Sequence, residues 1–84
     1  MTPTEFVDAL RTYCFRFGGS VTSLGRTPAH NVAVGGVADS LHQVWLAGDV
    51  VYDAPQPLEA RQRTAARLGL RLVPESDHDH LQAL

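Results

Sequence analysis

Residues 44–53, VWLAGDVVYD, decide how the chain can fold, because they predict its central strand. The stretch is rich in Val, Trp and Tyr, which favour strands, and apolar side chains flank its internal acid on both sides. A near-continuous apolar run of this kind predicts a strand that is buried on both faces. Asp49 interrupts the run, and His42 lies seven residues earlier. This spacing fits a strand whose polar residues have no special role. It also fits a pair of metal ligands.

Helices are predicted on either side of this strand. Thr2 and Glu5 have the spacing of a capping box, and the glycine pair at 18–19 ends the helix that follows. Residues 58–68, LEARQRTAARL, predict a second long helix. Shorter strands are predicted at residues 20–23, 70–74 and 80–84, with a turn at 75–79 and a helical stretch between 28 and 34. Because helices and strands do not alternate as in a parallel sheet, we expect one α+β domain over residues 1–84, with a small, mostly antiparallel sheet and helices packed on one face.

The size of the chain raises the expectation of a metal or a partner. A domain of 84 residues buries only about 60% of its unfolded surface, and such chains often need an additional stabilising element. Cys14 is the only cysteine, which excludes a disulfide within the chain, and its aromatic neighbours predict a buried small hydrophobe.

Charge and hydropathy exclude several classes of partner. The net charge is −2, from 7 arginines, no lysine and 9 acids, so there is no basic field to attract nucleic acid. No apolar run reaches the roughly 18 residues that a membrane span needs. The start of the chain, MTPTEFVDAL, lacks the basic and apolar regions of a signal peptide. We therefore expect cytoplasmic synthesis, with another export route for any action at a cell wall.

Histidines and carboxylates gather in two parts of the sequence. If the last strand pairs with the central one, both groups converge at one end of the sheet. The first group is His42 and Asp49, and the second is Glu75, Asp77, His78, Asp79 and His80. Imidazole and carboxylate together suit zinc, and three protein ligands with one water is the pattern of a catalytic site. Taken separately, each group also fits a polar loop or turn.

Two longer segments carry a resemblance to a known family. Residues 23–53, SLGRTPAHNVAVGGVADSLHQVWLAGDVVYD, and residues 75–82, ESDHDHLQ, resemble the zinc D-Ala-D-Ala carboxypeptidases and phage endolysin peptidases. These proteins share a fold with the zinc-containing domain of hedgehog proteins. The family pattern runs S-G-Y-R-[ST]-P-x-H-N-x-x-V-G-G, then S-x-H-x6-D, then acid-x-x-H. The matching residues are Arg26, Thr27, Pro28, His30, Asn31, Gly35, Gly36, Ser40, His42, Asp49 and His80, in that order.

The resemblance implies one Zn²⁺ ion per chain. Its ligands would be His42, Asp49 and His80, and the general base three residues before the last ligand would be Asp77. Glu75 is the alternative base, because Glu75-x-x-His78 also satisfies the acid-x-x-H motif.

Further roles follow from the same resemblance. His78 would contact the reacting carbonyl or its oxyanion, while Arg26 and Ser40 would contact the substrate. One departure concerns Gly25, which stands where relatives commonly have tyrosine and puts the shape of the substrate pocket in doubt.

The implied function is that of a zinc metallopeptidase, a hydrolase that uses a metal-activated water on a peptidoglycan stem peptide or cross-bridge. Both a D,D-carboxypeptidase and an endopeptidase or endolysin fit, of phage or bacterial origin. The alternative is a non-catalytic, zinc-stabilised binding module or phage structural module of the same fold.

Overall fold

The computed structural model describes residues 1–25, 28–33, 35 and 41–84, and for residues 28, 31, 32, 42 and 43 it describes the backbone only. The elements, in chain order, are α1 (Pro3–Phe17), β1 (Gly19–Ser23), α2 (Pro28–Ala33), the 3-10 helix η1 (Leu41–Val44), β2 (Ala47–Tyr52), α3 (Leu58–Arg67), β3 (Leu70–Pro74) and β4 (Asp79–Ala83). Arg26 and Ser40, both predicted site residues, lie outside the described residues.

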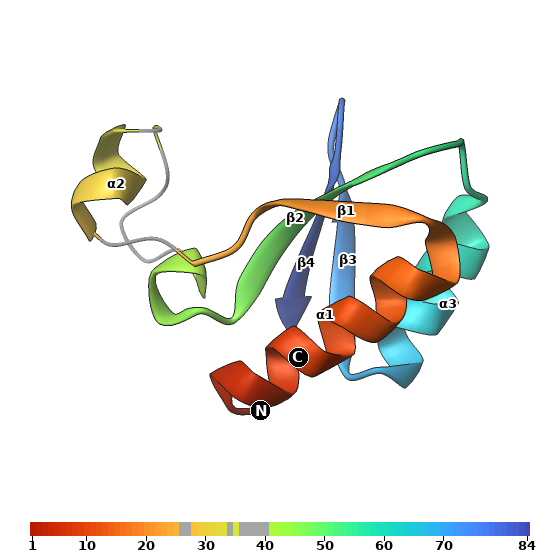
Figure 1. The fold of residues 1–84 in the computed structure, drawn as a ribbon, viewed down its shortest axis with the longest axis horizontal. Helices are drawn as coiled ribbons and strands as arrows, with labels where there is room; N and C mark the ends of the chain where they lie inside the picture. Colours follow the sequence, from red (N-terminus) through yellow and green to blue (C-terminus); the bar gives the residue numbers. More distant parts are fainter. Residues whose placement is uncertain (26–27, 34, 36–40) are drawn as a thin grey trace.

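The strands form one antiparallel sheet with the order β1-β2-β4-β3 (Figure 1). β2 and β4 are neighbours although about thirty residues separate them in sequence, whereas β3 and β4 form a hairpin. Helices α1 and α3 both pack against this sheet through a shared apolar core. The architecture confirms the predicted α+β class with a small antiparallel sheet.

Helix α1 follows directly from its sequence. Thr2 N–H donates to Glu5 Oε1 (2.8 Å), and Glu5 N–H donates to Thr2 Oγ1 (3.1 Å), which completes the predicted capping box. Gly18 ends the helix in the left-handed region, with φ of 63°. Cys14 packs half-buried against the core, and this burial raises the pKa of its thiol. Among the described residues, no helix is long and apolar enough to cross a membrane.

The core lies between one face of the sheet and the two long helices. Alternation along paired strands places Val50, Leu72 and Leu81 on the same face, and all three are buried. Its buried residues are Phe6, Leu10, Tyr13, Phe17, Val50, Ala65, Leu70, Leu72 and Leu81. The opposite face of β2 and β4 therefore carries the residues between these apolar positions, including Asp49 and His80.

The central strand is shorter than predicted. β2 begins at Ala47, because Val44 ends η1 and Trp45 takes a φ of 61°, which is incompatible with a strand. Trp45 packs instead over Gly25, where a Cβ atom would lie only 2.0–2.3 Å from the indole ring. Trp45 and Val44 are about half exposed, so the expectation of burial on both faces is wrong for this part of the stretch.

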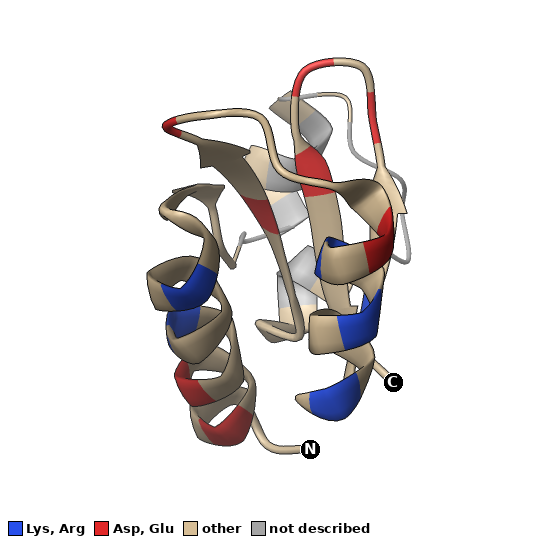
Figure 2. Cartoon of the chain, turned by 90° about the vertical axis from the view of Figure 1, so that its right-hand side faces the viewer, with Lys and Arg blue, Asp and Glu red and all other residues tan. Residues whose placement is uncertain are grey.

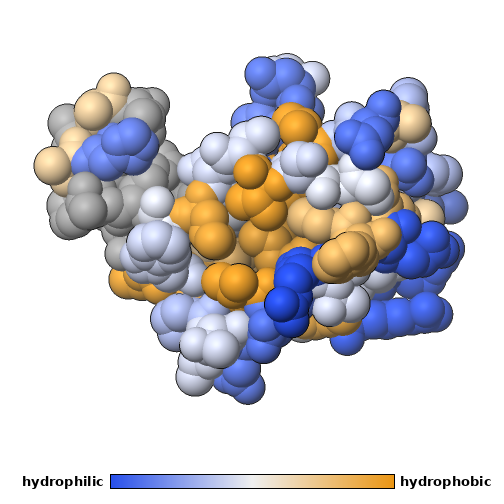
Figure 3. Space-filling view, in the orientation of Figure 1, coloured by the Kyte–Doolittle hydropathy of each residue, from blue (hydrophilic) through white to orange (hydrophobic). Residues whose placement is uncertain are grey.

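Apolar side chains are also exposed on the face that carries α1 and β1 (Figure 3). Those two elements contribute Val7, Phe15 and Val21, with Phe15 being 86% exposed. Phe6 on the same helix is 0% exposed. The two phenylalanines of α1 therefore provide a matched pair of buried and exposed positions.

Phe6→Ala should lower the free energy of unfolding by about 3–5 kcal/mol, because it leaves a cavity between α1 and the sheet. Phe15→Ala should change it by less than about 0.5 kcal/mol, since the ring lies in solvent. Urea unfolding followed by circular dichroism measures both. Equal losses for the two variants would show that α1 does not pack as described.

Candidate metal centre

Asp49 and His80 lie directly opposite each other on the face of the sheet that points away from α1 and α3. Asp49 of β2 is the cross-strand partner of His80 of β4, and Asp49 Oδ1 is 3.4 Å from His80 Nδ1. His78, two residues before His80, shares this face, and its Nε2 lies 3.7 Å from the same Asp49 oxygen. The side chains are 19%, 22% and 31% exposed for Asp49, His80 and His78. Pairing of β2 with β4 thus brings together three of the predicted site residues.

Each histidine is held through the ring nitrogen that faces away from Asp49. His80 Nε2 is hydrogen-bonded to Gln82 Oε1 at 2.9 Å, so Nε2 carries the proton. His78 Nδ1 is hydrogen-bonded to Asp77 Oδ1 at 2.6 Å. A metal-binding histidine characteristically donates its second ring N–H to a carbonyl or carboxylate, which fixes the tautomer. Both rings have that arrangement.

The spacing between the facing atoms suits a shared metal ion. Zinc–ligand bonds of about 2.0–2.1 Å in a tetrahedral site separate neighbouring ligand atoms by about 3.3–3.4 Å. The 3.4 Å between Asp49 Oδ1 and His80 Nδ1 matches this edge, and the 3.7 Å to His78 Nε2 is wider. Across the described side chains, however, no group of three or more His, Cys, Asp or Glu is arranged to hold a metal. Asp49 and His80 therefore fit as a ligand pair.

The remaining predicted ligand belongs to the segment before β2. His42 lies in η1, which precedes β2 by a short turn, and its side chain is outside the described residues. The two predicted candidates for the general base lie in the β3–β4 turn. Asp77 contacts His78 and is 85% exposed, while the backbone N–H of Glu75 donates to the carbonyl of His78.

Asp77 and His78 shift each other's protonation. The hydrogen bond from His78 lowers the pKa of Asp77. The same bond raises the pKa of His78 above its ordinary 6.5, outweighing partial burial, and the charge of Asp49 adds to the effect. The Asp77 carboxylate is therefore ionised at neutral pH.

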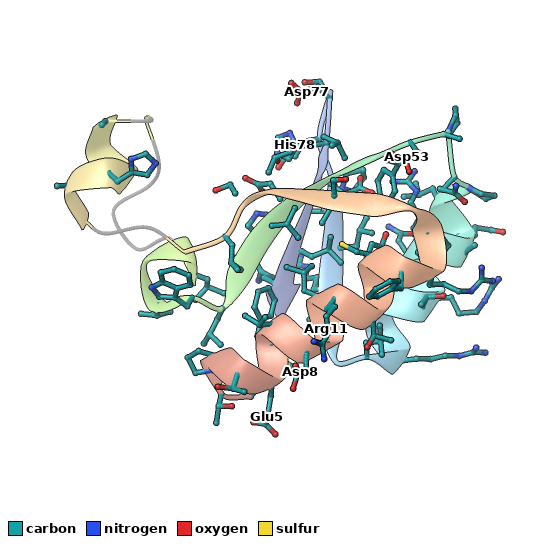
Figure 4. All side chains as sticks on the ribbon, viewed as in Figure 1. Glu5, Asp8, Arg11, Asp53, Asp77 and His78 are labelled. Carbon is teal, nitrogen blue, oxygen red and sulfur yellow. The ribbon has the colours of Figure 1, made fainter. Side chains whose placement is uncertain are left out.

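A groove of about 500 Å³ adjoins these two residues. It lies between the β2–α3 loop, residues 53–56, and the β3–β4 turn, residues 75–78, and Arg61 of α3 also lines it. Figure 4 shows Asp77 and His78 at the tip of the hairpin and Asp53 across from them. In Figure 2, acidic residues gather at this end of the sheet, whereas arginines lie along α1 and α3.

The sequence patterns grouped Asp79 with the residues of the site and did not single out its partners beneath the sheet. Asp79 lies between the two histidines but points into the core, where it is 3% exposed. Tyr52 Oη donates to Asp79 Oδ2 at 2.5 Å, and Arg61 pairs with the same oxygen. Tyr13 completes the cluster through a 2.6 Å bond to Tyr52 Oη. The alternation of the D-H-D-H run was the available signal, because neighbouring residues of a strand face opposite sides.

Burial keeps both tyrosines of this cluster protonated. It raises the pKa of Tyr13 to about 12, and it raises that of Tyr52 with help from the hydrogen bond to Asp79. At neutral pH, Tyr52 therefore remains a hydrogen-bond donor to the Asp79 carboxylate.

The structure also bears on the departure at Gly25. Because the indole of Trp45 occupies the space that a side chain at residue 25 would need, no tyrosine fits there without moving Trp45. The aromatic surface at residue 25 thus comes from Trp45, which is 50% exposed.

Comparisons of the chain with protein-family models, curated proteins and solved structures found no match.

Asp77→Asn should lower the pKa of His78 toward 6.5, because it removes the largest contribution to the raised value. Glu75→Gln should lower it much less, since the Glu75 side chain affects the pKa of His78 only through its charge and makes the smallest contribution. NMR titration of the imidazole C–H signals of metal-free protein measures both. Equal shifts in the two variants would contradict the Asp77–His78 hydrogen bond.

The same pairing sets the sign of a pH effect on stability. The folded protein binds the His78 proton more tightly than the unfolded chain does. This interaction therefore stabilises the fold below about pH 6.5, and the contribution is lost as pH rises through the raised pKa.

Proposed function

We propose that this protein is a zinc-dependent peptidase that hydrolyses a peptide bond of peptidoglycan. One observation carries the proposal: Asp49 and His80 face each other across β2 and β4 at a ligand-like spacing. These are two of the three ligands that the family resemblance implies.

Zinc would be held by His42, Asp49 and His80. When bound, the ion supplies a Lewis acid and lowers the pKa of its water toward about 7. Gln82 orients the His80 ring through Nε2, which directs the lone pair of Nδ1 toward Asp49. The outer face of the sheet thereby presents two acceptor atoms, Asp49 Oδ1 from β2 and His80 Nδ1 from β4.

Asp77 and His78 divide the remaining chemistry. Asp77 is an exposed, ionised carboxylate and is the proposed general base, which takes a proton during attack and returns it to the leaving amine. Its hydrogen bond to His78 Nδ1 turns His78 Nε2 toward Asp49. His78 can donate from Nε2 to the developing oxyanion only as the imidazolium, and the hydrogen bond to Asp77, which raises the pKa of His78, favours that protonated form.

The substrate assignment comes from the family resemblance. The groove beside Asp77 and His78 is lined by Tyr52, Arg61 and Asp79, and not by Asp49 or His80, so it adjoins the proposed base and does not contain the ligand pair. A stem peptide or a cross-bridge is the proposed substrate, with Arg26 and Ser40 as further contacts on the basis of the resemblance. The guanidinium of Arg26 suits a carboxylate or a developing oxyanion.

Zinc analysis tests the metal site. Wild-type protein should hold one zinc ion per chain, and Asp49→Ala and His80→Ala should each lose it. His30→Ala is the matched control, since His30 lies in α2, and it should keep the metal. Removal of zinc should lower the melting temperature, because a ligand present at 100 times its Kd stabilises the fold by about 2.7 kcal/mol. Wild-type protein without stoichiometric zinc would refute the proposal.

Activity on cell-wall sacculi tests the catalytic roles. Asp77→Asn should retain zinc but lose about 10²–10⁴-fold in turnover, the usual contribution of general acid–base catalysis. Glu75→Gln should lose far less, because it lies outside the Asp77-x-x-His80 spacing. If Glu75→Gln is inactive and Asp77→Asn is active, His78 replaces His80 as the third ligand.

Treatment with a chelator distinguishes a zinc peptidase from a non-catalytic zinc-binding module. Hydrolysis by zinc-loaded protein that stops on chelation and returns with added zinc supports the peptidase. Zinc binding without hydrolysis would instead favour a zinc-stabilised binding or phage structural module.

A further inference from the structure

A chemical repeat runs from the β3–β4 turn into β4 and leaves the register of the strand ambiguous. Residues 77–80 read Asp-His-Asp-His, so a shift of two residues would again place a histidine opposite Asp49. In that shifted register His78 would replace His80, and Asp77 would replace Asp79. The repeat alone therefore does not determine which histidine faces Asp49.

The burial pattern of the strand removes this ambiguity. Asp79 is the cross-strand partner of Val50 and is 3% exposed, whereas the side chain of Asp77 is 85% exposed. A shift of two residues would move Asp79 into the position of Leu81, which is 0% exposed. An ionised carboxylate placed there would lose its partners in the apolar core, which is strongly unfavourable.

Three elements meet on the one Asp79 oxygen. Tyr52 donates from β2, three residues after Asp49, and Arg61 donates from α3. Arg61 also binds the carbonyl of Gln56 through Nε at 3.0 Å, and its guanidinium lies 5.5 Å from the centre of the Tyr52 ring. β4 is therefore tied to β2 and α3 at its first residue, Asp79, which lies between His78 and His80.

We infer that Tyr52, Arg61 and Asp79 are positioning residues that hold His80 opposite Asp49 and His78 beside it. An apolar residue at 79 would fill the core at lower desolvation cost, since buried ion pairs are often replaceable by hydrophobic residues without loss of stability. The charge of Asp79 thus serves to orient the histidines on the outer face of the sheet. The expected effect of these residues on metal affinity rests on the proposed function.

Two matched variants test the inference. Tyr52→Phe removes the hydroxyl that donates to Asp79 and keeps the ring beside Arg61. Tyr13→Phe is the control, because it removes a buried hydroxyl that contacts Tyr52 but not Asp79. Both are examined at a temperature where circular dichroism shows a complete fold.

The first measurement uses zinc-free protein. In Tyr52→Phe the imidazole NMR signals of His78 and His80 should shift or broaden and the cross-strand contact between residues 49 and 80 should weaken. Both should stay as in wild type in Tyr13→Phe. Equal changes in the two variants, or none in Tyr52→Phe, would overturn the inference.

The second measurement is zinc affinity. Tyr52→Phe should weaken binding by about 10-fold, the lower end of the range for groups that orient metal ligands, while Tyr13→Phe changes it less than about 2-fold. Arg61→Met should weaken binding further, and Arg61→Lys should recover part of it. A lower melting temperature in Tyr52→Phe with unchanged zinc affinity would leave the cluster a purely structural role and overturn the inference. If wild-type protein binds no zinc, the proposed function fails, and the zinc-free NMR comparison still decides whether the cluster sets the strand register.

Discussion

The antiparallel pairing of β2 with β4 is the contact on which the rest of the structure depends. It joins two segments far apart in sequence and gives each strand two different faces. On one face, Val50 and Leu81 complete the core beneath α1 and α3. On the other, Asp49 and His80 meet at 3.4 Å. The same backbone hydrogen bonds therefore build the core and assemble the candidate site.

Each face of this pair of strands carries one carboxylate with little exposure to solvent. Asp79 is a buried carboxylate between the helices and the sheet, where it has donors from Tyr52 and Arg61. Asp49 is mostly buried on the opposite face, where imidazole nitrogens surround its Oδ1. Both carboxylates thus sit in regions of reduced solvent, and each has nitrogen or hydroxyl partners that offset desolvation. Loss of partners on either face would disturb the strand that both faces share.

Much of the candidate site was predictable because its histidines and carboxylates occur in short sequence motifs. The expected convergence of Asp49 with the histidines near residue 80 agrees with the observed register. The D-H-D-H alternation indicates that Asp79 faces away from the histidines, but not which of the two faces carries the core. The register of β4 against β2 places Asp79 opposite Val50 and so puts the carboxylate on the core side. Trp45 was likewise assigned to the central strand, because its positive φ arises from packing over Gly25 rather than from local preference.

Local sequence signals specify the helices of this protein. Capping at Thr2 and Glu5, the glycine after α1 and the helical spacing of apolar residues act over a few positions, so they can be read along the chain. The α+β class follows from the order of those elements. Which histidine lies opposite Asp49, and which acid is buried beneath it, depend instead on the register of β4 against β2. That register joins segments far apart in sequence, and the contacts of Tyr52 and Arg61 with Asp79 are its proposed anchor.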